Sequence, residues 1–88
     1  MGNIDILQKV ADIERLKCAL LSDTADLFKN MDADILCGLL STIYLLSSHL
    51  NINCNELDAR TAVKLRNTLL SGNSDESYIK NVLSHLTR

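Results

Sequence analysis

The residues best suited to chemistry are four aspartates in the first half of the chain. Asp23 and Asp26 are three positions apart, so they would share one face of a helix. Asp32 and Asp34 follow within a short segment. Acids carried by two facing helices can hold Mg²⁺ through their carboxylate oxygens. This spacing makes metal-dependent hydrolysis one candidate activity.

The other reactive side chains form no recognisable motif. His49 and His85 stand alone, without a partner that would make either a base, and no nucleophile elbow or phosphate-binding glycine loop is present. Cys18, Cys37 and Cys54 show no close pairing and no metal-ligand spacing with the histidines. We expect three free thiols, buried as small apolar side chains, in a protein of the reducing cytoplasm.

Two segments of the chain are similar to sequence motifs of a known family. Leu20–Leu27 carries two acids on one helix face, and Leu50–Asn53 followed by Asn55–Leu57 has the form of a turn that opens a further helix. On these segments, residues 16–71 weakly resemble the MazG-like all-α nucleotide pyrophosphohydrolases. Members of that family carry an E-E-x-x-E helix, an E-x-x-D motif on an apolar helix, a short turn and another helix.

The acidic motifs of this family are largely missing from the chain. Ser22 stands where the first acid belongs, and residues 35–38 are Ile-Leu-Cys-Gly where the second motif should fall. The resemblance therefore implies, at most, a Mg²⁺ cofactor held by Asp23 and Asp26. We expect no catalytic residues, no cofactor and no pyrophosphohydrolase activity, because two-metal hydrolysis needs acids on both sides of the leaving phosphate.

Composition limits the remaining classes of function. The chain has 88 residues, a net charge of −2 and 47% apolar residues, which predicts a single helical domain spanning 1–88. Arg60, Lys64 and Arg66 form the one basic cluster, but Glu56 lies four positions before Arg60, in the orientation that favours an ion pair on a helix. The balance argues against a nucleic-acid partner, which remains a weaker alternative.

The segment from Ile35 to Leu46 is the most apolar part of the sequence. Its twelve residues are too few for a membrane span, which needs about 20, so we expect no membrane partner. Its apolar side chains point almost all the way round a helix, and such a helix needs other protein on most sides.

The spacing of apolar residues at three and four, with no proline, predicts an all-α fold of three to four helices. The first should begin near Asn3 or Asp5 and continue to about Met31 as a continuous or kinked helix, and residues 22–24 could instead cap a second short helix. The others should span about 33–50, 55–71 and 75 to the end of the chain.

Capping chemistry marks the expected breaks near 30–32, 51–55 and 71–74. Asp32, Asn53 or Asn55, and Ser74 are the predicted N-caps. Gly72 is predicted to lie just past the third helix. Gly38, within the second helix, is expected to allow close approach of a neighbouring backbone.

The apolar surplus predicts self-association. Its residues on the second helix are Leu36, Leu39, Leu40, Ile43 and Leu46, and a second copy could cover them, most simply in a homodimer. The sequence therefore favours a small cytoplasmic interaction protein that acts by protein–protein contact as an adaptor, regulator or inhibitor. A MazG-like pyrophosphohydrolase, or an inactive relative of one, is the alternative.

Overall fold

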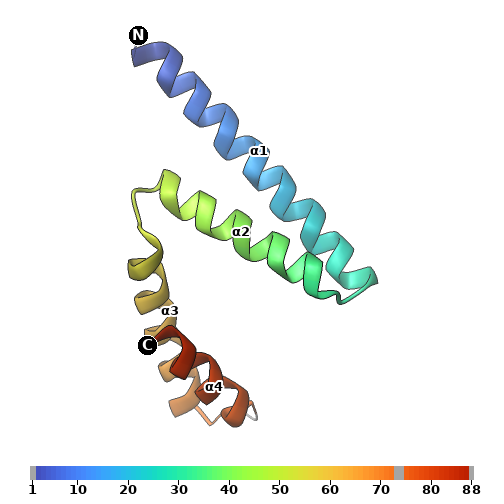
Figure 1. Ribbon diagram of the computed structural model, residues 1–88, viewed down its shortest axis with the longest axis vertical. Helices are drawn as coiled ribbons and strands as arrows, with labels where there is room; N and C mark the ends of the chain where they lie inside the picture. The colour runs from blue at the N-terminus through green and yellow to red at the C-terminus, as the bar shows by residue number, and fades with distance from the viewer. Residues whose placement is uncertain (1, 73–74, 88) are drawn as a thin grey trace. The chain divides into compact units, whose positions relative to one another are not determined.

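The computed structural model describes residues 2–72 and 75–87, which form four helices (Figure 1). These are α1 (Gly2–Lys29), α2 (Ala33–His49), α3 (Cys54–Leu70) and α4 (Glu76–Leu86). No strand occurs among these residues. The predicted all-α fold is confirmed. The chain leaves the helices near each predicted break, although α3 begins at Cys54, inside the predicted break 51–55.

The first helix is continuous through residues 22–24. Thr24, which could have capped a new helix, instead donates its hydroxyl to the backbone oxygen of Leu20 at 2.7 Å. This bond to the preceding turn keeps the hydroxyl inside α1. The 28 residues of α1 therefore form one element that is longer than its neighbour α2, with 17.

The ends of α2 follow from local hydrogen bonds. Asp32 is the N-cap, as predicted, and its Oδ1 accepts a bond from the backbone N of Asp34 at 2.8 Å. At the other end, Asn51 has a φ of 60°, and the backbone N of Ile52 donates to the oxygen of Ser47 at 3.0 Å. This is a Schellman closure, in which asparagine accepts the left-handed conformation.

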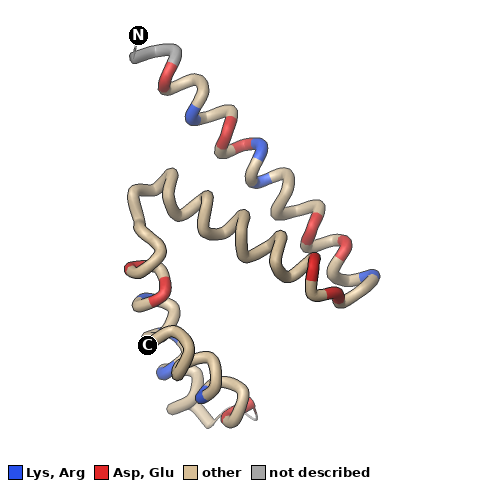
Figure 2. Tube along the Cα trace, in the orientation of Figure 1, with Lys and Arg blue, Asp and Glu red and all other residues tan. Residues whose placement is uncertain are grey.

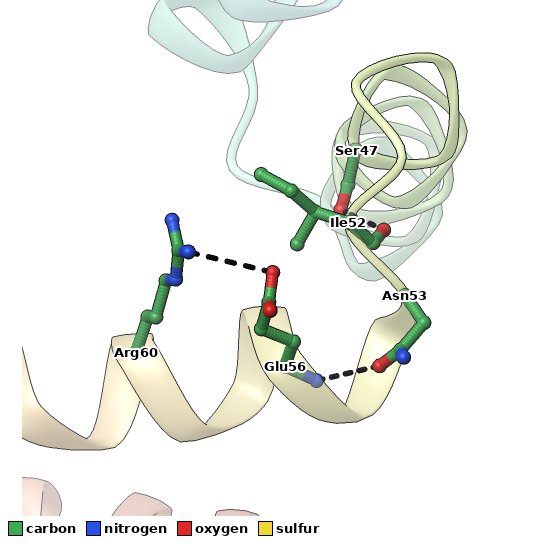
Figure 3. A network of polar contacts seen from close by, with 5 residues as sticks. All are labelled: Ser47, Ile52, Asn53, Glu56 and Arg60. Atoms are coloured by element: carbon green, nitrogen blue, oxygen red, sulfur yellow. Dashed lines mark hydrogen bonds and ion pairs between the residues drawn. The ribbon is translucent and has the colours of Figure 1, made fainter.

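The second pair of helices begins and ends with equally local chemistry. Asn53 caps α3 through a bond from the backbone N of Glu56 to its Oδ1 at 2.8 Å (Figure 3). Gly72 follows α3 with a φ of 81°. Both roles were predicted. Asp75 stands at the N-cap of α4. The predicted cap Ser74 lies outside the described residues.

The chain divides into two compact units, one up to Ile52 and one from Asn53 onward. In the first, α1 packs along α2, and in the second, α3 packs along α4. We describe each unit by itself. The single domain expected from the chain length stays a prediction.

The core of the first unit is small. Leu16 of α1 is its one buried apolar side chain among the described residues, and it is joined by Thr42 and Ser47 of α2. The apolar stripe of α1 is only partly covered, because its members Ile13, Leu20 and Leu27 are half-buried. The stripe's other members are exposed: Ile6, Leu7, Val10, Leu21 and Phe28.

The second unit buries Ala62 of α3 and Ile79 of α4. Half-buried leucines flank them and complete the apolar stripes of the two helices: Leu57, Leu65, Leu69, Leu83 and Leu86. Val82, at the edge of the stripe of α4, is more exposed. The unit is thus a conventional pair of amphipathic helices.

No single helix in the described part of the chain is long and apolar enough to cross a bilayer. The apolar helix α2 has 17 residues, whereas a span needs about 20. Of the described helices, only α2 and α3 taken together, across the break between them, reach the length and apolar composition of a membrane span.

Candidate functional site

The most unusual surface in the first unit belongs to α2, because nothing on it after its first turn carries a formal charge. From Ile35 to Asn55 the sequence contains no Asp, Glu, Lys or Arg, and the tube of Figure 2 is tan throughout this stretch. A solvent-facing helix normally carries charged residues on its outer side. The composition of α2 therefore suits a helix covered on several sides.

The side chains that α2 buries are nevertheless polar. Thr42 donates its hydroxyl to the backbone oxygen of Gly38 at 2.9 Å, and Ser47 donates to that of Ile52 at 2.7 Å (Figure 3). Because both hydroxyls have a partner, burying them carries little penalty. Thr42 and Ser47 are the buried residues of this helix, so its leucines and isoleucines are left at least partly accessible.

The five predicted self-association residues divide into two groups. Leu36, Leu40 and Ile43 are exposed, whereas Leu39 and Leu46 are half-buried. Leu36, Ile43 and Leu50 follow one another at intervals of seven residues, or about two turns, so they lie along one side of the helix.

Helix α1 presents a matching row. Val10, Leu21 and Phe28 are exposed and are separated by eleven and seven residues, which are about three and two turns. They therefore lie on one side of α1. We call the two rows together the hairpin face; its residues are Val10, Leu21, Phe28, Leu36, Ile43 and Leu50.

A pocket shows that the two rows open onto the same side of the helix pair. It has a volume of about 210 Å³ and is lined by Ile13 and Lys17 from α1 and by Leu46, His49 and Leu50 from the end of α2. The Nζ of Lys17 lies 3.0 Å from Oε1 of Glu14, so its ammonium group pairs with a carboxylate that does not line the pocket. Lys17 therefore offers the pocket mainly its hydrocarbon stem.

This pocket was not predicted from the sequence. The spacing of its lining residues in the sequence could have indicated it. Ile13 and Lys17 are four residues apart, and so are Leu46 and Leu50, so each pair presents two adjacent side chains on one helix face. The spacing could not predict that these two helix faces lie next to each other.

The aspartates considered for metal binding are placed in different settings. Asp23 is half-buried beside α2, whereas Asp26 is exposed. Asp32 serves as the cap of α2. In the described parts of the chain, no three His, Cys, Asp or Glu side chains are grouped so that they could hold a metal ion.

Two expectations about other side chains can be checked. Cys18, Cys37 and Cys54 are free, as predicted, but all three are exposed, so the expected burial is wrong. The buried residues of their helices are instead Leu16 in α1, Thr42 and Ser47 in α2, and Ala62 in α3. The predicted ion pair is confirmed, with Arg60 Nη2 lying 3.5 Å from Glu56 Oε2 (Figure 3).

No protein-family model, no curated protein and no solved structure matches the chain.

Proposed function

We propose that this protein is a small helical interaction protein that associates with itself and acts by protein–protein contact, as an adaptor, regulator or inhibitor. The observation that carries the proposal is the hairpin face. It combines exposed apolar side chains from both α1 and α2 with a helix that has no charge along most of its length. Exposed apolar side chains gathered on one side of a helix pair are typical of interaction sites.

The energetics favour cover by a protein surface. Burying a Leu, Ile or Phe side chain completely is worth about 1.5–3 kcal/mol relative to leaving it exposed. Leu36 is 48% exposed and Phe28 is 89% exposed, so each has a large part of that free energy still to gain. Small domains often obtain missing core through oligomerisation.

A cytoplasmic location belongs to the same proposal. Cys18, Cys37 and Cys54 are exposed and unpaired with one another. Exposed thiols persist in a reducing compartment, whereas an oxidising one would convert them to disulfides.

The test compares two leucines of α2 that differ in the side they occupy. Leu36 is 48% exposed and Leu45 is 53% exposed, but they are nine residues apart and so lie on opposite sides of the helix. We expect Leu36→Asp to abolish self-association while keeping the helical circular dichroism signal. Leu45→Asp, the matched control, should leave the assembly intact.

Light scattering and sedimentation over about a hundredfold range of concentration would measure the outcome. A wild-type chain that stays monomeric throughout, with a melting temperature independent of concentration, would contradict the proposal. Equal loss of association in both variants would show that the hairpin face is not the contact.

A further inference from the structure

We propose that two copies pair in antiparallel orientation across the hairpin face, with Phe28 of each copy seated in the pocket of the other. This inference rests on the proposed self-association and adds its geometry and its anchor residue. Phe28 is 89% exposed in the last turn of α1, beside the connection to α2. The pocket lies at the opposite end of the helix pair, where α2 ends.

The proposed arrangement places its two-fold axis midway along α1 between the ring and the pocket. Phe28 lies eight residues beyond Leu20, and Ile13 of the pocket lies seven residues before it. With a rise of 1.5 Å per residue, these are offsets of about 12 Å and 10 Å in opposite directions. A two-fold axis at the level of Leu20 therefore brings the ring of each copy to the level of the other copy's pocket, which gives two equivalent contacts.

Phe28 also lies on the correct side of the helix. Lys17, which lines the pocket, is eleven residues before Phe28, and eleven residues are about three turns. The ring and the pocket wall thus face the same way. An isologous contact needs both complementary features on one face, because each copy must offer what it receives.

The pocket is large enough for an aromatic ring. An apolar cavity of about 150 Å³ accommodates benzene, and the pocket formed with Leu46 and Leu50 measures about 210 Å³. Phe28 is the chain's one phenylalanine. Exposed aromatic side chains that enter a partner's pocket are the usual anchors of protein interfaces.

The distribution of charge favours the antiparallel orientation over the parallel one. The end that carries Phe28 holds four acids against Lys29, and the acids are Asp23, Asp26, Asp32 and Asp34 (Figure 2). The pocket end is balanced, because Asp5, Asp12 and Glu14 match its three bases, Lys9, Arg15 and Lys17. Parallel pairing would place the two acidic ends together, whereas antiparallel pairing places each acidic end beside a neutral one and so avoids this repulsion.

The decisive experiment mixes two defective variants. Phe28→Ala removes the ring but keeps the pocket, and Leu50→Trp keeps the ring but fills the pocket with an indole. Leu50 is exposed at the end of α2, so this replacement leaves the helix packing intact. We expect each variant alone to associate at least about tenfold more weakly than the wild type.

A one-to-one mixture should then associate more tightly than either variant alone, because one ring and one pocket remain intact in the mixed pair. Leu45→Ala is the control and should leave the affinity unchanged. Helical circular dichroism shows whether each variant is folded. Self-association that is insensitive to Phe28→Ala, or a mixture no tighter than its components, would overturn the antiparallel arrangement while leaving self-association in place.

A distance measurement separates the two orientations independently. A spin label at Lys29→Cys, in a chain with Cys18→Ser, Cys37→Ser and Cys54→Ser, should report copies about 27 Å apart along the helix axis, since Lys29 is nine residues from the level of Leu20. A short distance would indicate parallel pairing. A wild-type chain without any self-association would instead remove the function on which this inference rests.

Discussion

The carboxylate of Asp23 occupies the space in front of Gly38. A Cβ added at Gly38 would lie 3.1 Å from Oδ2 of Asp23 and 3.8 Å from its Cγ. The sequence predicted that Gly38 would admit a neighbouring backbone. The nearest neighbour is an acidic side chain from α1, so the glycine makes room for a carboxylate that lies against the start of α2.

This contact predicts a non-additive pair of substitutions. Gly38→Ala gains about 1 kcal/mol of helix propensity but places a methyl group 3.1 Å from Asp23 Oδ2. We expect its net effect on the free energy of unfolding to be near zero in the wild type. In an Asp23→Ala background it should be stabilising by about 1 kcal/mol. Denaturant titration of the four proteins measures the coupling, and additive effects would contradict the contact.

Two neighbouring positions on α2 should separate folding from association. Leu39 is half-buried, so Leu39→Asp places a charge within the helix pair and should lower the free energy of unfolding by about 3 kcal/mol. Ile43 is 42% exposed on the hairpin face, so Ile43→Asp should keep the helix signal and lose the assembly. Circular dichroism and sedimentation report the two properties. Identical behaviour of the variants would show that the two positions do not differ in this way.

The N-cap of α3 offers a prediction with a built-in control. Asn53 accepts a backbone bond from Glu56 through its Oδ1, whereas Asn55 lies within the first turn of the helix. We expect Asn53→Ala to destabilise the second unit by about 1 kcal/mol. Asn55→Ala should be neutral or slightly favourable. Amide hydrogen exchange in α3 measures the difference, and a larger effect at Asn55 would reverse the assignment of the cap.

The ion pair at the start of α4 predicts a dependence on pH. The hydrogen bond from Lys80 to Glu76, at 2.8 Å, and the positive charge of Lys80 lower the pKa of Glu76 below its ordinary value of 4.5. The pair's small contribution to α4 is therefore present above the unfolded pKa and is lost as the pH falls through the lowered value. Carbon chemical shifts of α4 during acid titration should show this loss, and Glu76→Gln should remove it.

The chemistry of the aspartates can be tested directly. We expect no release of pyrophosphate from nucleoside triphosphates in the presence of Mg²⁺ or Mn²⁺, because Asp23 faces Gly38 and not an opposing acid. Turnover that disappears with Asp23→Ala or Asp26→Ala would instead favour the MazG-like hydrolase. A rise in melting temperature with metal alone would reveal a binding site that survives without turnover.

The positions of the helices were predictable because their ends depend on nearby residues. Asp32, Asn53 and Gly72 each act within four residues of themselves, so their roles can be read from the local sequence. The continuity of α1 through Thr24 was the uncertain point, because its hydroxyl could bond either to its own helix or to a new one. The bond to the oxygen of Leu20 decides between them.

The side of α2 that faces α1 was not predictable, because a helix that is apolar nearly all round offers many equivalent sides. The structure turns Thr42 and Ser47 inward, and their hydroxyls bond to nearby backbone oxygens. A prediction based on apolar residues alone places polar side chains such as Thr42 and Ser47 on the outer side of the helix. The same limitation applies to Cys37, which was expected to be buried and is exposed.

The hairpin face also has a consequence for the lifetime of the protein. If it is covered only when copies pair, each newly made chain displays Phe28 and Ile43 until it meets another. Unpaired chains would then be preferred substrates for proteases and chaperones, whereas paired chains would be protected. The steady-state amount of protein would then rise more than proportionally with its rate of synthesis. A modest rise in expression would produce a large rise in the amount of paired, protected protein.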